Sequence, residues 1–171
     1  MPISSAASRK SPRPGYDAAA LPSFASYPDI VKALREPLEL SAPLARQLAP
    51  RLCRTDPDTG ENCSWYHGFW QQLRLMRLVV TPADHAEFYH RAFQTVTGGS
   101  GAPRVLVSGA TDYSMLAHVL AICRERGLEP ELTVVDHCET SLFLNRWYAE
   151  RASAGVECNR SGAGARPRSA D

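Results

Sequence analysis

The chain has 171 residues, of which 44% are hydrophobic and 22% are charged, as in an ordinary soluble globular domain with a modest core. Its 19 basic and 18 acidic side chains nearly cancel, which argues against nucleic acid or an anionic membrane as a partner. No apolar run approaches the roughly 20 residues that a membrane-spanning helix needs. Small neutral or mixed partners remain open.

Five cysteines are spread along the chain, and no secretory signal is recognisable. Free thiols in a reducing cytoplasm are the expected state of an odd, widely spaced set. Cys53, Cys63 and His67 carry the ligand types that zinc prefers. No fourth ligand has a convincing spacing, although His85 and His90 lie downstream. The sequence therefore predicts a cytoplasmic protein without a metal site.

The first part of the chain divides into a tail and a helical region. Residues 1–27 are rich in proline, serine and alanine, which predicts disorder. Residues 28–97 show helical spacing of apolar side chains and form the predicted helical region. Pro37 and Pro50 are expected to punctuate two short helices at its start. The stretch 54–62 is predicted to be a polar turn, because it lacks the full ligand series of a calcium loop.

Two further helices are predicted in this region. In the first, Trp65, Phe69 and Leu73 share one face at helical spacing and are expected to pack in the core. The second begins at 81–84, where threonine, proline and aspartate suit a capping box with proline at the first helical position.

The pattern of residue types changes after a glycine-rich linker at 98–103. Strands and helices then alternate, with predicted ranges of 104–108, 112–127, 131–136 and 139–155. Such alternation predicts parallel strands with right-handed crossovers. The expected fold class is α/β, with a helical N-terminal region followed by the first β-α-β-α part of an incomplete Rossmann-like parallel sheet over residues 104–157.

The ends of the two predicted strands carry the candidate binding residues. The first strand runs into the turn Ser108-Gly109-Ala110-Thr111, and the second ends at Asp136. Ligands of doubly wound sheets lie beyond the carboxyl ends of the strands, beside a helix N-terminus. Glycine lets the backbone approach the ligand, and the acid accepts hydrogen bonds from ribose hydroxyls. The structural alternative is a tight turn at Gly109 and a helix cap at Asp136.

This arrangement resembles the class I S-adenosylmethionine-dependent methyltransferase family over about residues 28–157. Members commonly place a helical region before the cofactor strand and its glycine-rich turn. The resemblance implies S-adenosylmethionine as the cofactor and an unidentified methyl acceptor. The methionine part would contact residues 108–111, the ribose would contact Asp136, and the adenine would lie near His137 and Cys138.

The same resemblance implies a lid and marks two departures. Tyr66, His67 and Trp70 would close over the cofactor, and His67 is the candidate catalytic base. The family usually has glycine where this chain has Thr111 and Tyr113. The larger side chains are expected to narrow the cofactor space.

A second resemblance is to the opening of extended short-chain dehydrogenases, which would imply an NAD(P)-dependent, reductase-like nucleotide binder. That family would have glycine at positions 112 and 115, where this chain has Asp112 and Met115. It also uses a tyrosine followed four residues later by lysine, a pair that this sequence does not contain.

The segment 158–171 is rich in arginine, glycine, alanine, serine and proline, and is predicted to be a disordered tail. Its composition suggests a chain truncated or frameshifted after about residue 157. An unpaired sheet edge would remain, so poor solubility, homodimerisation or marginal stability is expected. The alternative function is accordingly a non-catalytic interaction or dimerisation module.

Overall fold

The computed structural model describes residues 27–56, 58–96 and 102–161. The predictions for the N-terminal tail, for most of the linker and for residues 162–171 therefore lie outside the described residues. No described helix combines the length and the apolar character that crossing a bilayer requires.

The first described element is one long helix, α1 (Tyr27–Leu52), where two short helices were expected. Three prolines lie inside it, although an interior proline costs a helix about 3 kcal/mol. A stripe of small and apolar side chains runs along the helix and is fully or almost fully buried, namely Leu38, Ala42, Ala45 and Ala49. Tertiary packing of this stripe stabilises the helix across the prolines.

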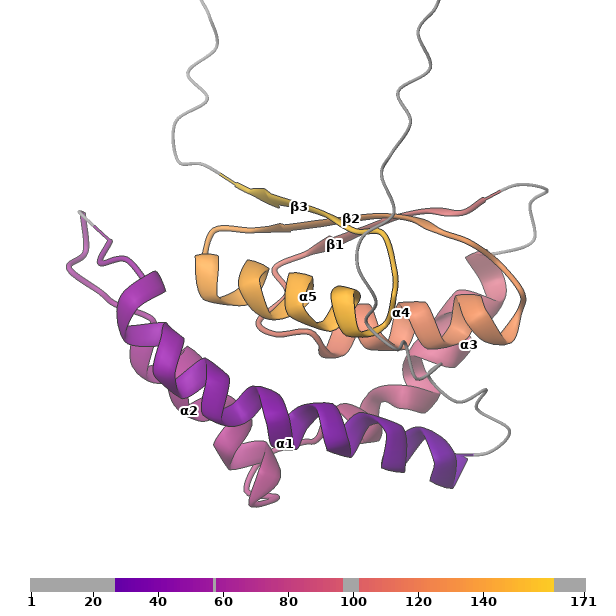
Figure 1. Cartoon of the computed structure of the whole chain (residues 1–171), viewed down its shortest axis with the longest axis horizontal. Coiled ribbons are helices and arrows are strands. Elements are labelled where there is room, and N and C mark those ends of the chain that lie inside the picture. The colour runs from indigo at the N-terminus through magenta and orange to yellow at the C-terminus, as the bar shows by residue number, and fades with distance from the viewer. Residues whose placement is uncertain (1–26, 57, 97–101, 162–171) are drawn as a thin grey trace, which may run out of the picture.

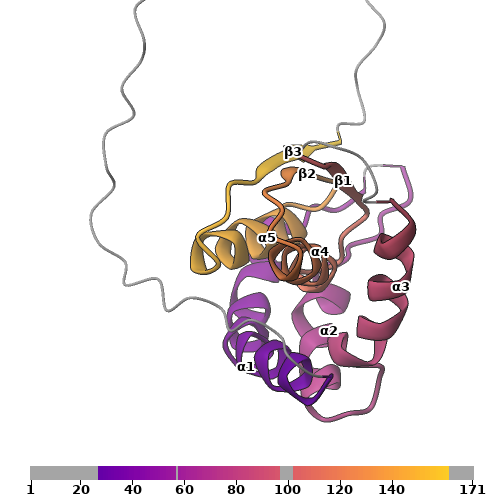
Figure 2. The same ribbon diagram turned by 90° about the vertical axis from the view of Figure 1, so that its right-hand side faces the viewer.

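Helix α2 (Ser64–Leu75) packs against α1 (Figures 1 and 2). Gly68 lies at this contact, where an added side-chain carbon would meet Ala49 Cβ at 3.6 Å, an ordinary van der Waals distance. The predicted core face is wrong: Trp65 is 68% exposed and Phe69 is also exposed, while the buried face carries His67, Gly68, Gln71 and Arg74. On this buried polar face, Gln71 accepts from the Ser41 hydroxyl of α1, and Arg74 forms an ion pair with Asp112.

A 3-10 turn, η1 (Pro82–His85), leads into α3 (Ala86–Val96). The predicted capping box is confirmed. The backbone N–H and the hydroxyl of Thr81 both lie 2.7 Å from Asp84 Oδ2. Local hydrogen bonding therefore begins this helical segment, as its sequence indicates.

The rest of the chain is a three-stranded parallel sheet with two helices, so the molecule is mixed α/β (Figure 1). The elements are β1 (Arg104–Ser108), α4 (Ser114–Glu125), β2 (Glu131–Asp136), α5 (Glu139–Arg151) and β3 (Glu157–Arg160). The strand order is β1-β2-β3. The third strand corrects the predicted boundary at residue 157, because Cys158 and Asn159 pair with Val134 and Val135. Its short polar sequence has no strand periodicity, and backbone pairing with β2 makes it a strand.

Helices α4 and α5 cover one face of the sheet, and all the helices lie on that side (Figure 1). On β1, Val107 points into the core and is 2% exposed, whereas its neighbour Leu106 is 65% exposed on the other face. Among the described residues, no helix covers this second face. Homodimerisation through it stays a prediction.

His118 of α4 makes the stability of the fold depend on pH. Its Nε2 lies 2.8 Å from the carbonyl oxygen of Pro82, and its ring stacks on Tyr89. Burial lowers the pKa of His118 to about 4. An unfolded histidine has a pKa of about 6.5, so between these values the unfolded chain binds more protons, and the free energy of unfolding falls as the pH falls.

We expect this group to remove up to about 3 kcal/mol of unfolding free energy between pH 6.5 and pH 4. Urea titrations across this range should show a shallower pH dependence for His118→Gln than for the wild type. His137→Gln is the control, since the His137 side chain is 79% exposed. Equal slopes for His118→Gln and the wild type would contradict the assignment.

Candidate functional site

The carboxyl ends of β1 and β2 lie side by side and bring the predicted binding residues together. Ser108 pairs with Val135, and the Gly109 N–H donates to the Val135 carbonyl over 3.0 Å. Asp136 follows directly in β2. The turn 108–111 and Asp136 therefore occupy one edge of the sheet, in the relation that parallel strands impose.

Gly109 has the backbone conformation that this turn needs. Its φ is +67°, in the left-handed region that side-chain-bearing residues rarely adopt. Apart from Gly109 itself and its two chain neighbours, no heavy atom of the described residues lies within 4 Å of the position that a Cβ would take. The turn thus combines a glycine-dependent conformation with open space beside the backbone.

Asp136 is buried and accepts hydrogen bonds from residues at the start of α5. Its Oδ1 accepts from the Cys138 N–H over 2.8 Å, and its Oδ2 accepts from the Ser141 hydroxyl over 2.9 Å. The structural alternative, Asp136 as the N-cap residue, is wrong, because Cys138 holds that position. Each carboxylate oxygen of Asp136 can accept a further hydrogen bond, which leaves capacity for a ribose hydroxyl. His137 lies beside this carboxylate, with its Nδ1 3.5 Å from Asp136 Oδ1.

The side chain of Tyr113, one of the two departures from glycine, lies in the core and not in the turn. Its side chain is 0% exposed and belongs to the core between the sheet and its helices. The ring stacks on Tyr148 with centroids 4.9 Å apart and meets Trp147 edge-on. Thr111, the other departure from glycine, remains in the turn and is partly buried.

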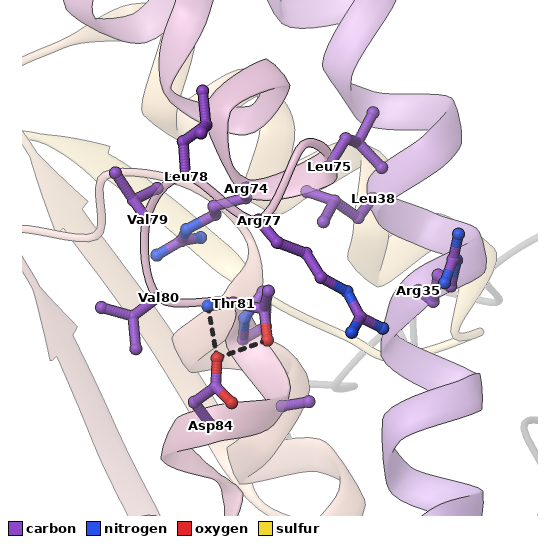
Figure 3. A pocket seen from close by; sticks show the side chains of 12 residues that line it. Arg35, Leu38, Arg74, Leu75, Arg77, Leu78, Val79, Val80, Thr81 and Asp84 are labelled. Atoms are coloured by element: carbon purple, nitrogen blue, oxygen red, sulfur yellow. Dashed lines mark hydrogen bonds between the residues drawn. The ribbon is translucent and has the colours of Figure 1, made fainter.

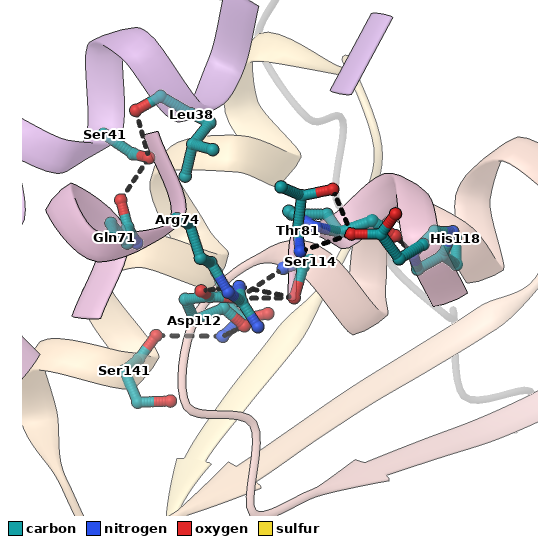
Figure 4. A network of polar contacts seen from close by, with 12 residues as sticks. Leu38, Ser41, Gln71, Arg74, Thr81, Asp112, Ser114, His118 and Ser141 are labelled. Carbon is teal, nitrogen blue, oxygen red and sulfur yellow. Dashed lines mark hydrogen bonds and ion pairs between the residues drawn. The ribbon is translucent and has the colours of Figure 1, made fainter. Parts of the chain in front are cut away.

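A buried ion pair, which no sequence pattern predicted, joins this turn to the helical region. Arg74 of α2 pairs with Asp112, and the same carboxylate accepts from the backbone N–H and the hydroxyl of Ser114, over 2.8 Å and 2.6 Å (Figure 4). The Asp112 carboxylate therefore accepts hydrogen bonds from the first residue of α4. An aspartate two residues before Ser114 signals a helix cap, but nothing local identifies Arg74 as its partner.

The residues predicted to close over the site lie on α2, and His67 faces the sheet edge. Tyr66 is exposed and its ring lies 5.1 Å from that of Trp70. His67 is buried, and its electrostatic neighbours include Asp136 and the Thr111 backbone. Burial works to lower the pKa of His67, but Cys138 and Asp136 outweigh it and raise the pKa.

His67 also belongs to a cluster of four side chains that can bind metal. Its partners are Cys53, Cys63 and Cys138, and one ligand atom from each residue lies within 4.8 Å of all the others. The prediction of no metal site depended on a missing fourth ligand, which Cys138 supplies. Neither His85 nor His90, the downstream candidates, is part of the cluster.

The thiols of this cluster differ in acidity. Burial raises the pKa of Cys53 to about 12. Burial would also raise the pKa of Cys138, but the His67 imidazole and the backbone N–H groups of Ser141 and Thr140 outweigh it and lower the value to about 6. The His67 imidazole and, after it, the start of α5 therefore favour a thiolate at Cys138.

A cavity of about 710 Å³ lies between α1 and the segment that joins α2 to η1 (Figure 3). Apolar side chains and arginines line it, among them Leu38, Leu78, Arg35 and Arg77. Arg74 also lines the cavity, which places it beside the ion pair with Asp112. Its size is that of a small-molecule site.

The fold and the site define a mixed α/β protein with candidate binding residues at the carboxyl ends of parallel strands. Comparisons with protein-family models, with curated protein sequences and with solved structures give no match to this chain.

Proposed function

We propose that this chain is the cofactor-binding portion of an S-adenosylmethionine-dependent methyltransferase. The observation that carries the proposal is the placement of Gly109, with its open left-handed turn, beside Asp136 at the ends of two adjacent parallel strands. The turn 108–111 would receive the methionine part, and Asp136 would accept the ribose hydroxyls.

Three further features support this reading. Tyr113 leaves the turn free, because its ring is in the core. The strand order β1-β2-β3 is that of one half of a doubly wound sheet. Helix α2 holds His67 near the backbone of Thr111, where a lid residue would lie.

The same geometry disfavours the dinucleotide alternative. A short-chain dehydrogenase would have glycine at position 112, to let the pyrophosphate approach the helix N-terminus. Here position 112 is an aspartate, whose carboxylate pairs with Arg74 and accepts from the Ser114 N–H at the start of α4. A bulky acidic side chain therefore stands where that family needs glycine.

Titration calorimetry with S-adenosylhomocysteine tests the proposal, with NADPH as the competing ligand. We expect heat from S-adenosylhomocysteine alone and a loss of affinity of about tenfold or more in Gly109→Ala, which forces a side chain into a left-handed turn at a cost of about 1–2 kcal/mol. Gly127→Ala is the matched control, because Gly127 has a φ of +64°, open space around it and no place at the sheet edge.

The two variants should lose similar stability, but only Gly109→Ala should lose affinity. Heat from NADPH alone would support the reductase-like alternative. Heat from neither ligand would reject both cofactors and favour the non-catalytic module.

A further inference from the structure

We infer that Cys53, Cys63, His67 and Cys138 form a closed site of three thiolates and one imidazole for one Zn²⁺ ion, which ties the helical region to the end of β2. The inference does not depend on the proposed methyltransferase function. It would replace the predicted role of His67 as a base and the predicted contact of Cys138 with adenine.

The distances suit a tetrahedral ion. The Sγ atom of Cys138 lies 3.6 Å from Cys53 Sγ and 3.6 Å from Cys63 Sγ. Tetrahedral zinc with Zn–S bonds of about 2.3 Å places its sulfurs about 3.8 Å apart. A disulfide would need about 2.05 Å, and all five cysteines of the chain are free.

Local structure delivers three of the four ligands. Cys53 directly follows α1, and Cys63 directly precedes α2. His67 lies one helical turn after Cys63, and its backbone N–H donates to the Cys63 carbonyl over 3.0 Å. The two side chains therefore project from the same face of the helix start.

The polar turn at 54–62 brings Cys53 back to Cys63. Asp56 accepts hydrogen bonds from the backbone N–H groups of Asp58 and Thr59, each over 2.9 Å. A single antiparallel bridge between Thr55 and Asn62 closes the turn. This confirms the polar turn predicted from the sequence, since the Asp56 carboxylate is used within it.

The fourth ligand comes from the other half of the molecule. Cys138 is the N-cap residue of α5, and Asp136 accepts its backbone N–H. The free N–H groups at the start of α5 favour a thiolate there. Cys53 is supported from the same helix, since Thr140 Oγ1 lies 3.2 Å from its sulfur.

Apolar packing alone does not account for the burial of these four ligands. The hydrophobic residues buried together at this place are Ala49, Cys53 and Cys138, and Cys63 packs against them. Alanine and thiols supply little apolar area, and a buried histidine is among them. The Nδ1 atom of His67 is buried and makes no hydrogen bond within the described residues. Burying an unsatisfied polar atom costs free energy that a metal–nitrogen bond would recover.

The donor set identifies the ion and its role. Thiolate and imidazole ligands at tetrahedral spacing select Zn²⁺ among the common biological cations. All four positions are filled by side chains, so no coordination position is left for water or substrate, as in structural zinc sites. The ion would hold α2 and the turn 54–62 against the start of α5.

The experiment is metal analysis of the full chain purified under reducing conditions, followed by titration of the metal-free chain with Co²⁺ and competition with Zn²⁺. We expect about one Zn²⁺ per chain, and thiolate-to-cobalt charge-transfer bands with the intense visible bands of tetrahedral cobalt. Cys138→Ser and His67→Ala should bind Co²⁺ at least 100-fold more weakly. Cys158→Ser is the matched control, because Cys158 is a partly buried free cysteine outside the cluster.

His67→Cys keeps the result interpretable if the weaker variants fold poorly. This variant would complete a set of four thiolates, so it should still bind metal and shift the cobalt spectrum. If His67 had only a structural or catalytic role without metal, the variant would not show this spectrum.

Wild-type protein that contains less than a tenth of an equivalent of zinc and gives no tetrahedral cobalt spectrum would overturn the inference. A disulfide between two of the three cluster cysteines in the reduced preparation would do the same. Calorimetry with S-adenosylhomocysteine is a separate readout, so failure of the cofactor proposal and failure of the zinc site are distinguishable.

Discussion

Replacing Arg74 with methionine is expected to lower the free energy of unfolding by about 3–5 kcal/mol, because removing one partner leaves the other charge buried and unpaired. Arg74 and Asp112 are both buried, and their pair connects α2 to the turn after β1. Methionine keeps much of the side-chain volume, so the loss would report the charge. Chemical denaturation of the two proteins measures the difference.

Arg91→Met is the control, because the side chains of Arg91 and its partner Glu87 are 74% and 67% exposed. Its cost should be about 1 kcal/mol or less. Adding Asp112→Asn to the Arg74 variant should recover part of the loss, since no unpaired charge then remains. Similar costs for Arg74→Met and Arg91→Met would show that the buried pair is not a strong link.

Replacing Tyr113 with glycine, the residue that the methyltransferase family usually has there, is expected to destabilise the chain by about 3–5 kcal/mol without tightening the binding of S-adenosylhomocysteine. The ring is fully buried against Tyr148 and Trp147, so its loss would leave a cavity in the core. Thermal unfolding and calorimetry measure the two effects on the same samples.

Thr111→Gly is the matched comparison, because Thr111 is the departure from glycine that lies within the turn. If side chains limit the cofactor space, relief should come from this position and not from Tyr113. Tighter cofactor binding by Tyr113→Gly would place the ring in the cofactor space and contradict the observed packing.

Two links hold the helical region to the carboxyl edge of the sheet. The Arg74–Asp112 pair reaches the turn after β1, and the four-ligand cluster reaches the end of β2 through Cys138. Both links use the buried polar face of α2, which carries His67 and Arg74. This explains why α2 buries polar side chains and leaves its aromatic face outside. The contacts of α2 with the sheet edge therefore include an ion pair and thiol groups, in addition to its packing on α1.

Features with a local cause could be predicted from the sequence. Residue periodicity predicts β1 and β2 and the helices between and after them, because burial on one side repeats along each element. The capping box at Thr81 and Asp84 is predictable because both partners lie within one turn. The left-handed turn at Gly109, directly after β1, is predictable because few residues other than glycine adopt that backbone conformation.

Local patterns misled where tertiary contacts outweighed them. Pro37 and Pro50 predict helix ends, yet α1 continues through them because its buried stripe packs on α2. The aromatic face of α2 suggests a core, but the polar face is buried because Arg74 meets its partner there. β3 has no sequence signal because the pairing of Cys158 and its neighbours with β2 forms it.

The sites themselves depend on residues that are distant in the sequence. The sequence indicates an incomplete set of metal ligands at Cys53, Cys63 and His67. It also indicates that Asp136 is an acid at the end of a strand. Only the folded chain places Cys138, which is far from them in the sequence, against that set. Chemical identity is a property of each residue, whereas which residues meet is decided by how α1 and α2 pack together and how α1 packs on α5.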